Sequence, residues 1–388
     1  MRLPSAEALK GLVGWEAPYG VLSVYVAIDP GDRGGAWKIA LRDQIDAAVE
    51  AADAADRAQE IAIKATAARI RERFEPSTPP SGRMQIGFVA CAPKPAGEVP
   101  EEWFAVQFPV ERTRVAYGRR PNLRRLAEIV DDGRPRAVVA LSSERVRLFE
   151  WRHGEVTELA ERELELLEAE WRERKAPRMR DPASGHAVSS AGRDQHDQRL
   201  DQHRKRFLKG SAAAARAALG DGAADELLCI GDPGLCEAFL GGWDSPPRDV
   251  TVEPADVITE PAAVIAERAT AKLVEADAAR DAELVERALG AAQAAGGAGA
   301  LGLTETARAL ARGQVERLLI DADREIPADG IDDGLRAELE AVSPLPSGGL
   351  DEWIVEEAIR TSAAITAIRA QPAERLAEHG GVGALLRY

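Results

Sequence analysis

Short apolar runs rich in Val, Ile and Leu alternate along this chain with longer segments whose apolar residues recur at helical spacing. The runs GVLSVYVAIDP (20–30), MQIGFVAC (84–91) and AVVALSS (137–143) are of the first kind. Residues 36–74 are of the second kind, and no Pro interrupts them. Buried strands are short and β-branched, whereas helices are longer and periodic. The alternation therefore predicts an α/β fold.

The length of 388 residues predicts more than one domain. We expect three consecutive α/β domains, with bounds 1–108, 109–275 and 276–388. The first holds the long helical segment, which EPSTPPSG (75–82) ends. In the second, PNLRRLAEIVDDG (121–133) has helical spacing, and RVRLFEWRHGEVTEL (145–159) is typical of a hairpin that turns at His153-Gly154. A long Ala- and Glu-rich helix, 261–295, leads to the third.

Two motifs mark the third domain. In LTETARALARGQVERLLID (303–321), Thr304 is predicted to cap a helix, Gly313 to end it and VERLLID to form a strand. The chain closes on GGVGALLRY (380–388), which predicts a terminal strand with glycine turns. Gly380, Gly381 and Gly383 are interpreted as turn residues because no Walker lysine accompanies them.

Charge and cysteine content exclude several classes of protein. The net charge of −15 argues against a protein that coats nucleic acid, since such binding needs many Lys and Arg contacts to phosphate. The three cysteines are odd in number and lack metal-site spacing, so we expect free thiols in a reducing compartment. No run approaches the length of a membrane span and no leader is evident. We expect a cytoplasmic protein without cofactor, metal or membrane partner.

One basic island stands out in this acidic chain. Residues 171–209 contain eleven Lys and Arg residues and five Asp and Glu residues. The part APRMRDPASGHAVSSAG (176–192) has no apolar periodicity and predicts an exposed loop, and a basic helix is expected from Asp194 onward. A loop flanked by Arg and Lys suits an RNA-lined cavity, because basic side chains pair with phosphate.

Three stretches together resemble the archaeo-eukaryotic class I release factor and Pelota superfamily, in particular its bacterial members. ARALARGQVERLLID and GGVGALLRY are similar to the third domain of those factors, and AVVALSSERVRLFEWRHGEVTEL (137–159) is similar to the second. The resemblance implies a central domain that carries the family's Gly-Gly-Gln loop. It also implies a C-terminal domain that resembles kink-turn-binding ribosomal proteins and contacts a translational GTPase.

The position of that loop is held here by Gly192-Arg193-Asp194-Gln195. The resemblance implies that Gln195 positions a water against the ester of peptidyl-tRNA in the ribosomal A site and that Gly192 permits the bend of the loop. Such chemistry rests on positioning and on an oriented backbone donor for the developing oxyanion. Contacts to rRNA and the tRNA acceptor end are expected from the basic residues Arg193, Arg199, His203, Arg204, Lys205 and Arg206.

The sequence departs from the family pattern at two positions, and this keeps a second function open. Arg193 and Asp194 replace the two glycines before the Gln, and Asp194 adds a carboxylate and a Cβ where the backbone approaches RNA. A related eukaryotic peptidyl-tRNA hydrolase of the Vms-like type tolerates Gly-x-x-Gln, whereas the related hibernation factor Balon occupies ribosomes without releasing peptide. We find no counterpart of the stop-codon-reading loop in 36–74, so rescue or hibernation is expected rather than codon-specific termination.

Simpler interpretations remain beside these. Gln195 could be an exposed glutamine of no consequence, and the basic island could be a solvated helix face. His186, His196 and His203 could bind a metal, although their spacing lacks the i, i+4 pairing of a helical site. Gly231-Asp232-Pro233-Gly234 is interpreted as a turn and Cys229 as a core thiol. A scaffold that does not act on the ribosome is the third class.

Overall fold

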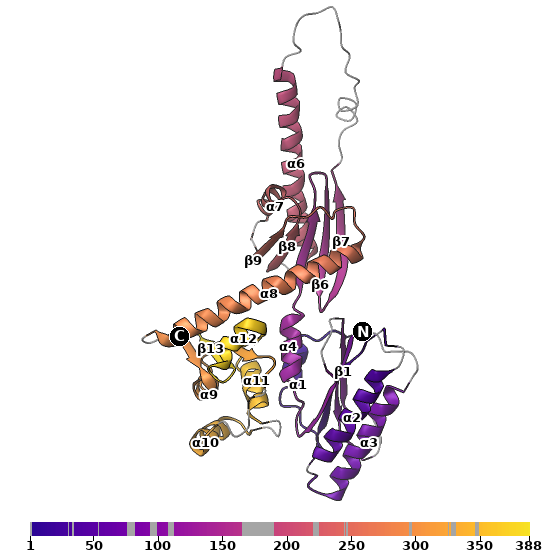
Figure 1. The fold of residues 1–388 in the computed structure, drawn as a ribbon, viewed down its shortest axis with the longest axis vertical. Helices are drawn as coiled ribbons and strands as arrows, with labels where there is room; N and C mark the ends of the chain where they lie inside the picture. The colour runs from indigo at the N-terminus through magenta and orange to yellow at the C-terminus, as the bar shows by residue number, and fades with distance from the viewer. Residues whose placement is uncertain are drawn as a thin grey trace, which may run out of the picture. The chain divides into compact units, whose positions relative to one another are not determined.

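The computed structural model of the chain folds into two compact units, which are described separately (Figure 1). Unit 1 comprises Met1–Arg134 and Glu275–Tyr388, and unit 2 comprises Pro135–Val274. The three sheets and their helices confirm the predicted α/β class. The boundaries of the three expected domains stay a prediction. The structure describes residues 2–29, 31–32, 35–52, 54–75, 82–93, 99–107, 112–164, 190–219, 225–243, 245, 247–294, 297–324, 326, 331–345 and 349–388, without the side chains of 190–197 and 199.

The N-terminal part of unit 1 is a four-stranded antiparallel sheet with helices on both faces. Its strands have the order β3-β2-β1-β4. The elements are α1 (Ala6–Leu12), β1 (Val21–Ala27), α2 (Ala36–Ala51), α3 (Arg57–Arg73), β2 (Met84–Ala90), β3 (Glu101–Val106), β4 (Arg114–Gly118) and α4 (Arg124–Asp132). The strand and helix segments predicted between residues 20 and 91 are thus confirmed.

Strand β1 shows why this sheet needs cover on both faces. Leu22, Val24 and Val26 pack in the core beneath α2 and α3, whereas Val21 and Tyr25 face the opposite core. Successive side chains of a strand point to opposite faces, so an unbroken apolar run predicts a strand that is buried on both sides.

The C-terminal part of unit 1 has a four-stranded mixed sheet of order β10-β13-β11-β12. Its elements are β10 (Gly299–Leu301), α9 (Gly302–Ala311), β11 (Val315–Asp321), α10 (Asp333–Val342), α11 (Leu350–Arg360), β12 (Ala364–Ile368), α12 (Ala370–Ala377) and β13 (Val382–Leu386). The predicted strand VERLLID is β11, the terminal strand is β13, and Gly313 follows α9 with φ 67°. The predicted cap at Thr304 is wrong, because α9 already begins at Gly302 after Leu301.

Helix α4 is capped by a side chain from far along the chain. Leu123 precedes the helix without a side-chain cap, and the Glu352 carboxylate on α11 accepts hydrogen bonds from the backbone N–H of Leu123 (2.6 Å) and Arg124 (3.4 Å). Unsatisfied N–H groups at a helix start are a cost that such a carboxylate removes. Burial raises the pKa of Glu352 to about 8, although these two hydrogen bonds act to lower it.

The raised pKa of Glu352 predicts how unit 1 responds to pH. In the folded protein the Glu352 carboxyl keeps its proton up to about pH 8, whereas in the unfolded chain it releases the proton near pH 4.5. The stabilisation that comes from this proton is therefore fully present below pH 4.5 and is lost as the pH rises to about 8. The loss is at most about 1.4 kcal/mol per pH unit. Glu352→Gln retains an acceptor oxygen without a titrating proton. We therefore expect it to gain stability relative to wild type between about pH 5 and about pH 8 in urea denaturation, and a pH-independent difference would contradict this.

Unit 2 is built on a five-stranded sheet of order β7-β6-β5-β8-β9. Its elements are β5 (Arg136–Leu141), β6 (Arg145–Arg152), β7 (Glu155–Glu163), α6 (Ser190–Ala218), β8 (Glu226–Ile230), α7 (Pro233–Leu240) and β9 (Asp249–Glu253). The predicted hairpin is β6–β7, and it turns at His153 (φ 49°) and Gly154 (φ 81°) as expected. Helix α8 (Ala262–Gln293) begins in this unit and continues into unit 1.

Two cores sandwich the sheet of unit 2. Val139 and Leu148 face α6 and α7, whereas Val138 and Ala140 face the first part of α8. Parallel strands β5, β8 and β9 are joined through helices, as a parallel pairing requires. Within the described part of the chain, no helix has the length and hydropathy of a membrane span.

Candidate nucleic-acid interface on helix α6

Helix α6 is anchored to the sheet of unit 2 by its second half. Its residues in the core, Leu208, Ala212 and Ala215, are spaced three or four apart, as one face of a helix requires, and Leu219 just after the helix continues this core. Before Phe207, no described side chain of α6 belongs to this core. With 29 residues the helix is about 43 Å long, and its first half extends beyond the strands (Figure 1). The packed half thus positions the projecting half.

The sequence-predicted site lies at the start of this helix. Gly192, Arg193 and Gln195 have helical backbone in the first two turns of α6. The expectation that the loop extends through Gly192 is therefore wrong by three residues, because α6 begins at Ser190. Ser and Ala accept helical backbone, and a single Gly costs only about 1 kcal/mol there. The side chains of Arg193, Gln195 and Arg199 lie outside the description, as do residues 165–189, which hold the rest of the predicted loop.

Arg204 forms ion pairs within unit 2. Its guanidinium lies 3.2 Å from the Glu144 carboxylate in the turn between β5 and β6, and 3.6 Å from Asp201 one turn earlier on α6. A second contact joins α6 to strand β7: Arg162 of β7 donates a hydrogen bond of 2.8 Å to the backbone carbonyl of Gly210 on α6. His203 is half-buried. These contacts fix the direction of α6 relative to the β6–β7 hairpin.

One flank of α6, beside the face that packs on the sheet, carries a stripe of cationic side chains. Lys205, Lys209 and Arg216 are exposed and project within about 40° of one another, over about 16 Å of helix. Arg206 is exposed beside them. Within the described part of the chain none of the four forms an ion pair. We name Lys205, Arg206, Lys209 and Arg216 the basic stripe; their charges are available to an anionic surface.

The basic stripe differs in part from the residues chosen on sequence. Lys205 and Arg206 were predicted RNA contacts and are exposed. Lys209 and Arg216 were not among them, although their i, i+4 and i, i+11 spacing from Lys205 places all three on one helix face. Such a spacing is readable from sequence once the buried face of the helix is known.

The other residues that could carry chemistry, the cysteines and histidines, are buried, half-buried or outside the described residues. All three cysteines are free and buried. A hydrogen bond with Cys236, together with burial, raises the pKa of the Cys229 thiol well above its usual value, so Cys229 is the core thiol that we expected. No metal-ligating cluster occurs among the described residues. His186 and the side chain of His196 lie outside them, so the histidine metal site stays an untested alternative.

Comparison with known proteins bears on the central segment of the chain. The sequence profile of bacterial archaeo-eukaryotic release factor family 10 matches residues 121–293, which include all of α6. No curated protein matches the chain in sequence.

Solved structures that match are distant in sequence. An archaeal translation termination factor, aRF1, is 18% identical, covers 99% of this chain and 98% of its own, and has a TM-score of 0.25. Archaeal Pelota, from a model of ribosome-bound Pelota and ABCE1, is 13% identical in sequence, and the match covers 100% of this chain and 95% of the Pelota chain, with a TM-score of 0.39. Dom34 of S. cerevisiae, described as interacting with Hbs1, is 10% identical over 79% of each chain, with a TM-score of 0.33.

Proposed function

We propose that this chain, a bacterial protein of the archaeo-eukaryotic release factor and Pelota superfamily, acts in the ribosomal A site and releases peptide from peptidyl-tRNA without reading a codon. One observation carries the proposal. Helix α6 lies within the matched segment, holds Gly192-Arg193-Asp194-Gln195 in its first two turns, and also bears the exposed basic stripe. A group that must reach RNA and cations that pair with phosphate thus share one rigid element.

In this proposal the chain contributes positioning rather than an acid or base. Gln195 orients a water toward the ester carbonyl, and Gly192, which has no side chain, lets the backbone approach closely. Backbone N–H groups beside Gln195 stabilise the developing oxyanion. Lys205 and Arg206 hold rRNA or the acceptor stem, together with Arg193 and Arg199.

Asp194 favours a second candidate function. It places a carboxylate directly before Gln195, where the superfamily has glycine and where phosphates would be close. Repulsion between these anions would keep Gln195 away from the ester, and the same contacts would then shield the A site of an idle ribosome without chemistry. Asp194→Gly separates the two functions, because it removes both the charge and the Cβ.

The proposed partners follow from the same assignment. They are rRNA and the acceptor end of peptidyl-tRNA for α6, and a translational GTPase for the C-terminal domain, all of which would be met in the cytoplasm. The three-domain division at 108 and 275, with a C-terminal domain similar to kink-turn-binding ribosomal proteins, belongs to this proposal.

The deciding experiment is release of labelled peptide from stalled ribosome nascent-chain complexes. Wild-type protein is expected to release peptide, and Gln195→Ala is expected to lose release while it still co-sediments with ribosomes, since the substitution removes the water-positioning amide but none of the cations. Glu237→Gln, a change on α7 away from this helix start, serves as the matched control and should leave release unchanged.

Each other outcome assigns a different function. Binding without release by wild type, with release gained by Asp194→Gly, would identify an A-site-shielding factor. Absence of ribosome binding would contradict both functions and leave a scaffold.

A further inference from the structure

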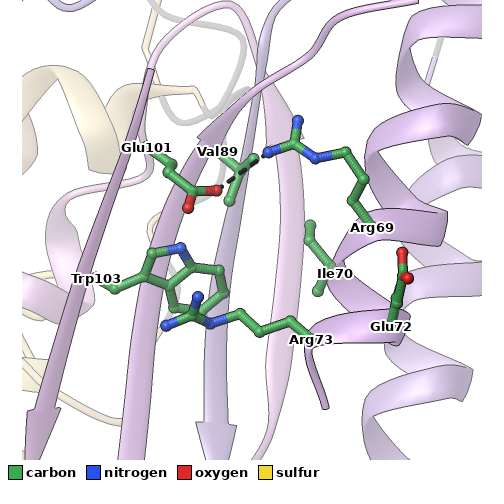
Figure 2. Close-up of a pocket in the computed structure, with 7 residues that line it drawn as sticks. All are labelled: Arg69, Ile70, Glu72, Arg73, Val89, Glu101 and Trp103. Atoms are coloured by element: carbon green, nitrogen blue, oxygen red, sulfur yellow. Dashed lines mark hydrogen bonds and ion pairs between the residues drawn. The ribbon is translucent and has the colours of Figure 1, made fainter. Parts of the chain in front are cut away.

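A pocket in the N-terminal part of unit 1 lies outside the segment that matches the release-factor family. It has a volume of about 330 Å³ and opens between the last turns of α3 and the strands β2 and β3 (Figure 2). Ile70 and Val89 are buried and form an apolar surface in it. Its other lining residues are Arg69, Glu72, Arg73, Glu101 and Trp103.

The position of Trp103 is set by a glycine on the neighbouring strand. Trp103 pairs in register with Gly87, and a Cβ at Gly87 would lie 2.3 Å from the indole ring. The indole therefore rests directly on the β2 backbone. Phe74 contacts it edge-on, with ring centroids 5.8 Å apart. The aromatic wall of the pocket is thus fixed by backbone and core contacts.

Arg73 is held over this wall with its hydrogen-bond donors unused. It reaches across from α3, and its guanidinium carbon lies 4.1 Å from the centroid of the Trp103 ring (Figure 2). Stacking of this kind orients the planar fork of an arginine. The side chain is exposed, and it forms no ion pair or hydrogen bond within the described part of the chain.

Two further N–H groups in the pocket lack acceptors. Arg69 donates a hydrogen bond of 3.2 Å to the Glu101 carboxylate, but its other terminal nitrogen, Nη1, is enclosed and has no partner among the described residues. The indole Nε1–H of Trp103 is in the same situation. These two donors are enclosed and out of reach of an occupant, whereas the Arg73 guanidinium is exposed. The pocket therefore favours an occupant that supplies acceptor oxygens to Arg73.

The charges of the lining select the kind of anion. Glu101 already neutralises Arg69, and Glu72 is a second acidic residue of the lining. A phosphate dianion would be repelled by both glutamates, whereas a single carboxylate can pair with the Arg73 fork in bidentate geometry. The buried surface of Ile70 and Val89 suits an apolar body attached to that carboxylate.

We propose that this pocket binds a small organic monocarboxylate, whose carboxylate pairs with Arg73 and whose apolar body lies against Ile70, Val89 and Trp103. The inference is independent of peptide release, because none of these residues belongs to α6 or to the matched segment.

The test follows the indole N–H signals of the full chain by NMR during titration with benzoate. Trp103→Phe identifies the signal of Trp103 among the seven tryptophans. We expect benzoate to shift that signal, and neutral benzamide, which has the same shape, to shift it only at much higher concentration. Arg73→Gln should weaken benzoate binding at least about tenfold, since a charge-assisted hydrogen bond is lost.

Arg71→Gln is the matched control. Arg71 lies two residues away on the same helix and carries the same charge, but it pairs with Asp46 and does not line the pocket. If Arg71→Gln weakened benzoate binding as much as Arg73→Gln does, the effect would come from the overall positive charge of the helix, and the assignment of Arg73 as the carboxylate partner would be wrong. Tighter binding of adenosine monophosphate or inorganic phosphate would overturn the monocarboxylate class, and no shift of the Trp103 signal with any probe would overturn the pocket as a binding site.

Discussion

Arg124→Met is expected to destabilise unit 1 by about 3–5 kcal/mol, the cost of breaking a buried ion pair. The Arg124 side chain is only 11% exposed, and it lies 2.5 Å from the Asp351 carboxylate and 3.3 Å from that of Glu128. It also donates hydrogen bonds to the carbonyls of Asp321 (2.8 Å) and Arg324 (2.5 Å). Met replaces the aliphatic stem but none of the donors. One substitution therefore leaves a buried carbonyl, a partly buried carbonyl and the Asp351 carboxylate without this partner.

Native-state hydrogen exchange measures the effect where it arises. We expect the amides of α4, β11 and α11 to lose protection together, because Arg124 joins these elements, while the amides of unit 2 retain theirs. The matched control is Arg125→Met. Arg125 is adjacent, pairs with Glu128 alone among the described residues and is 31% exposed, so its loss should cost no more than about 1 kcal/mol. Similar losses for both variants would show that Arg124 is not the connecting residue.

The strand and helix pattern of unit 1 and unit 2 was predictable because local signals carry it. The His153-Gly154 turn, the β-branched run of β11 and the glycine at position 313 each restrict the backbone within a few residues. The start of α6 was placed too late because Gly192 is a poor helix former, whereas Ser190 and Ala191 already extend the helix.

Contacts between distant residues could not be predicted in the same way. The cap of α4 comes from Glu352, more than two hundred residues later, and no local pattern announces it. Arg204 was chosen as an RNA contact because it lies in a basic run, but its partner Glu144 belongs to a turn sixty residues earlier. The pocket above Trp103 depends on strand register with Gly87, which follows from the pairing of β2 and β3 and not from either strand alone.

Neutralising the basic stripe should weaken ribosome binding without loss of fold. In the variant Lys205→Gln, Lys209→Gln, Arg216→Gln, three exposed cations are removed from one helix face, and none of them contributes to the core. Each cation paired with phosphate releases counterions, so we expect affinity to fall about 10- to 100-fold and the slope of log affinity against log salt to become shallower by about 2 to 3. Sedimentation of ribosomes with labelled protein at several salt concentrations measures both.

The salt slope distinguishes a direct interface from a change in net charge. Arg42→Gln, Arg57→Gln, Lys64→Gln removes the same charge from exposed positions on α2 and α3. A phosphate bound along α6 pairs with none of these three cations, so the control should keep the wild-type slope. An equal change of slope in both variants would mean that ribosome binding depends on the net charge of the chain and not on contacts made by α6. A change confined to Lys205, Lys209 and Arg216 would place phosphate along α6, because only their removal takes paired charges out of the complex.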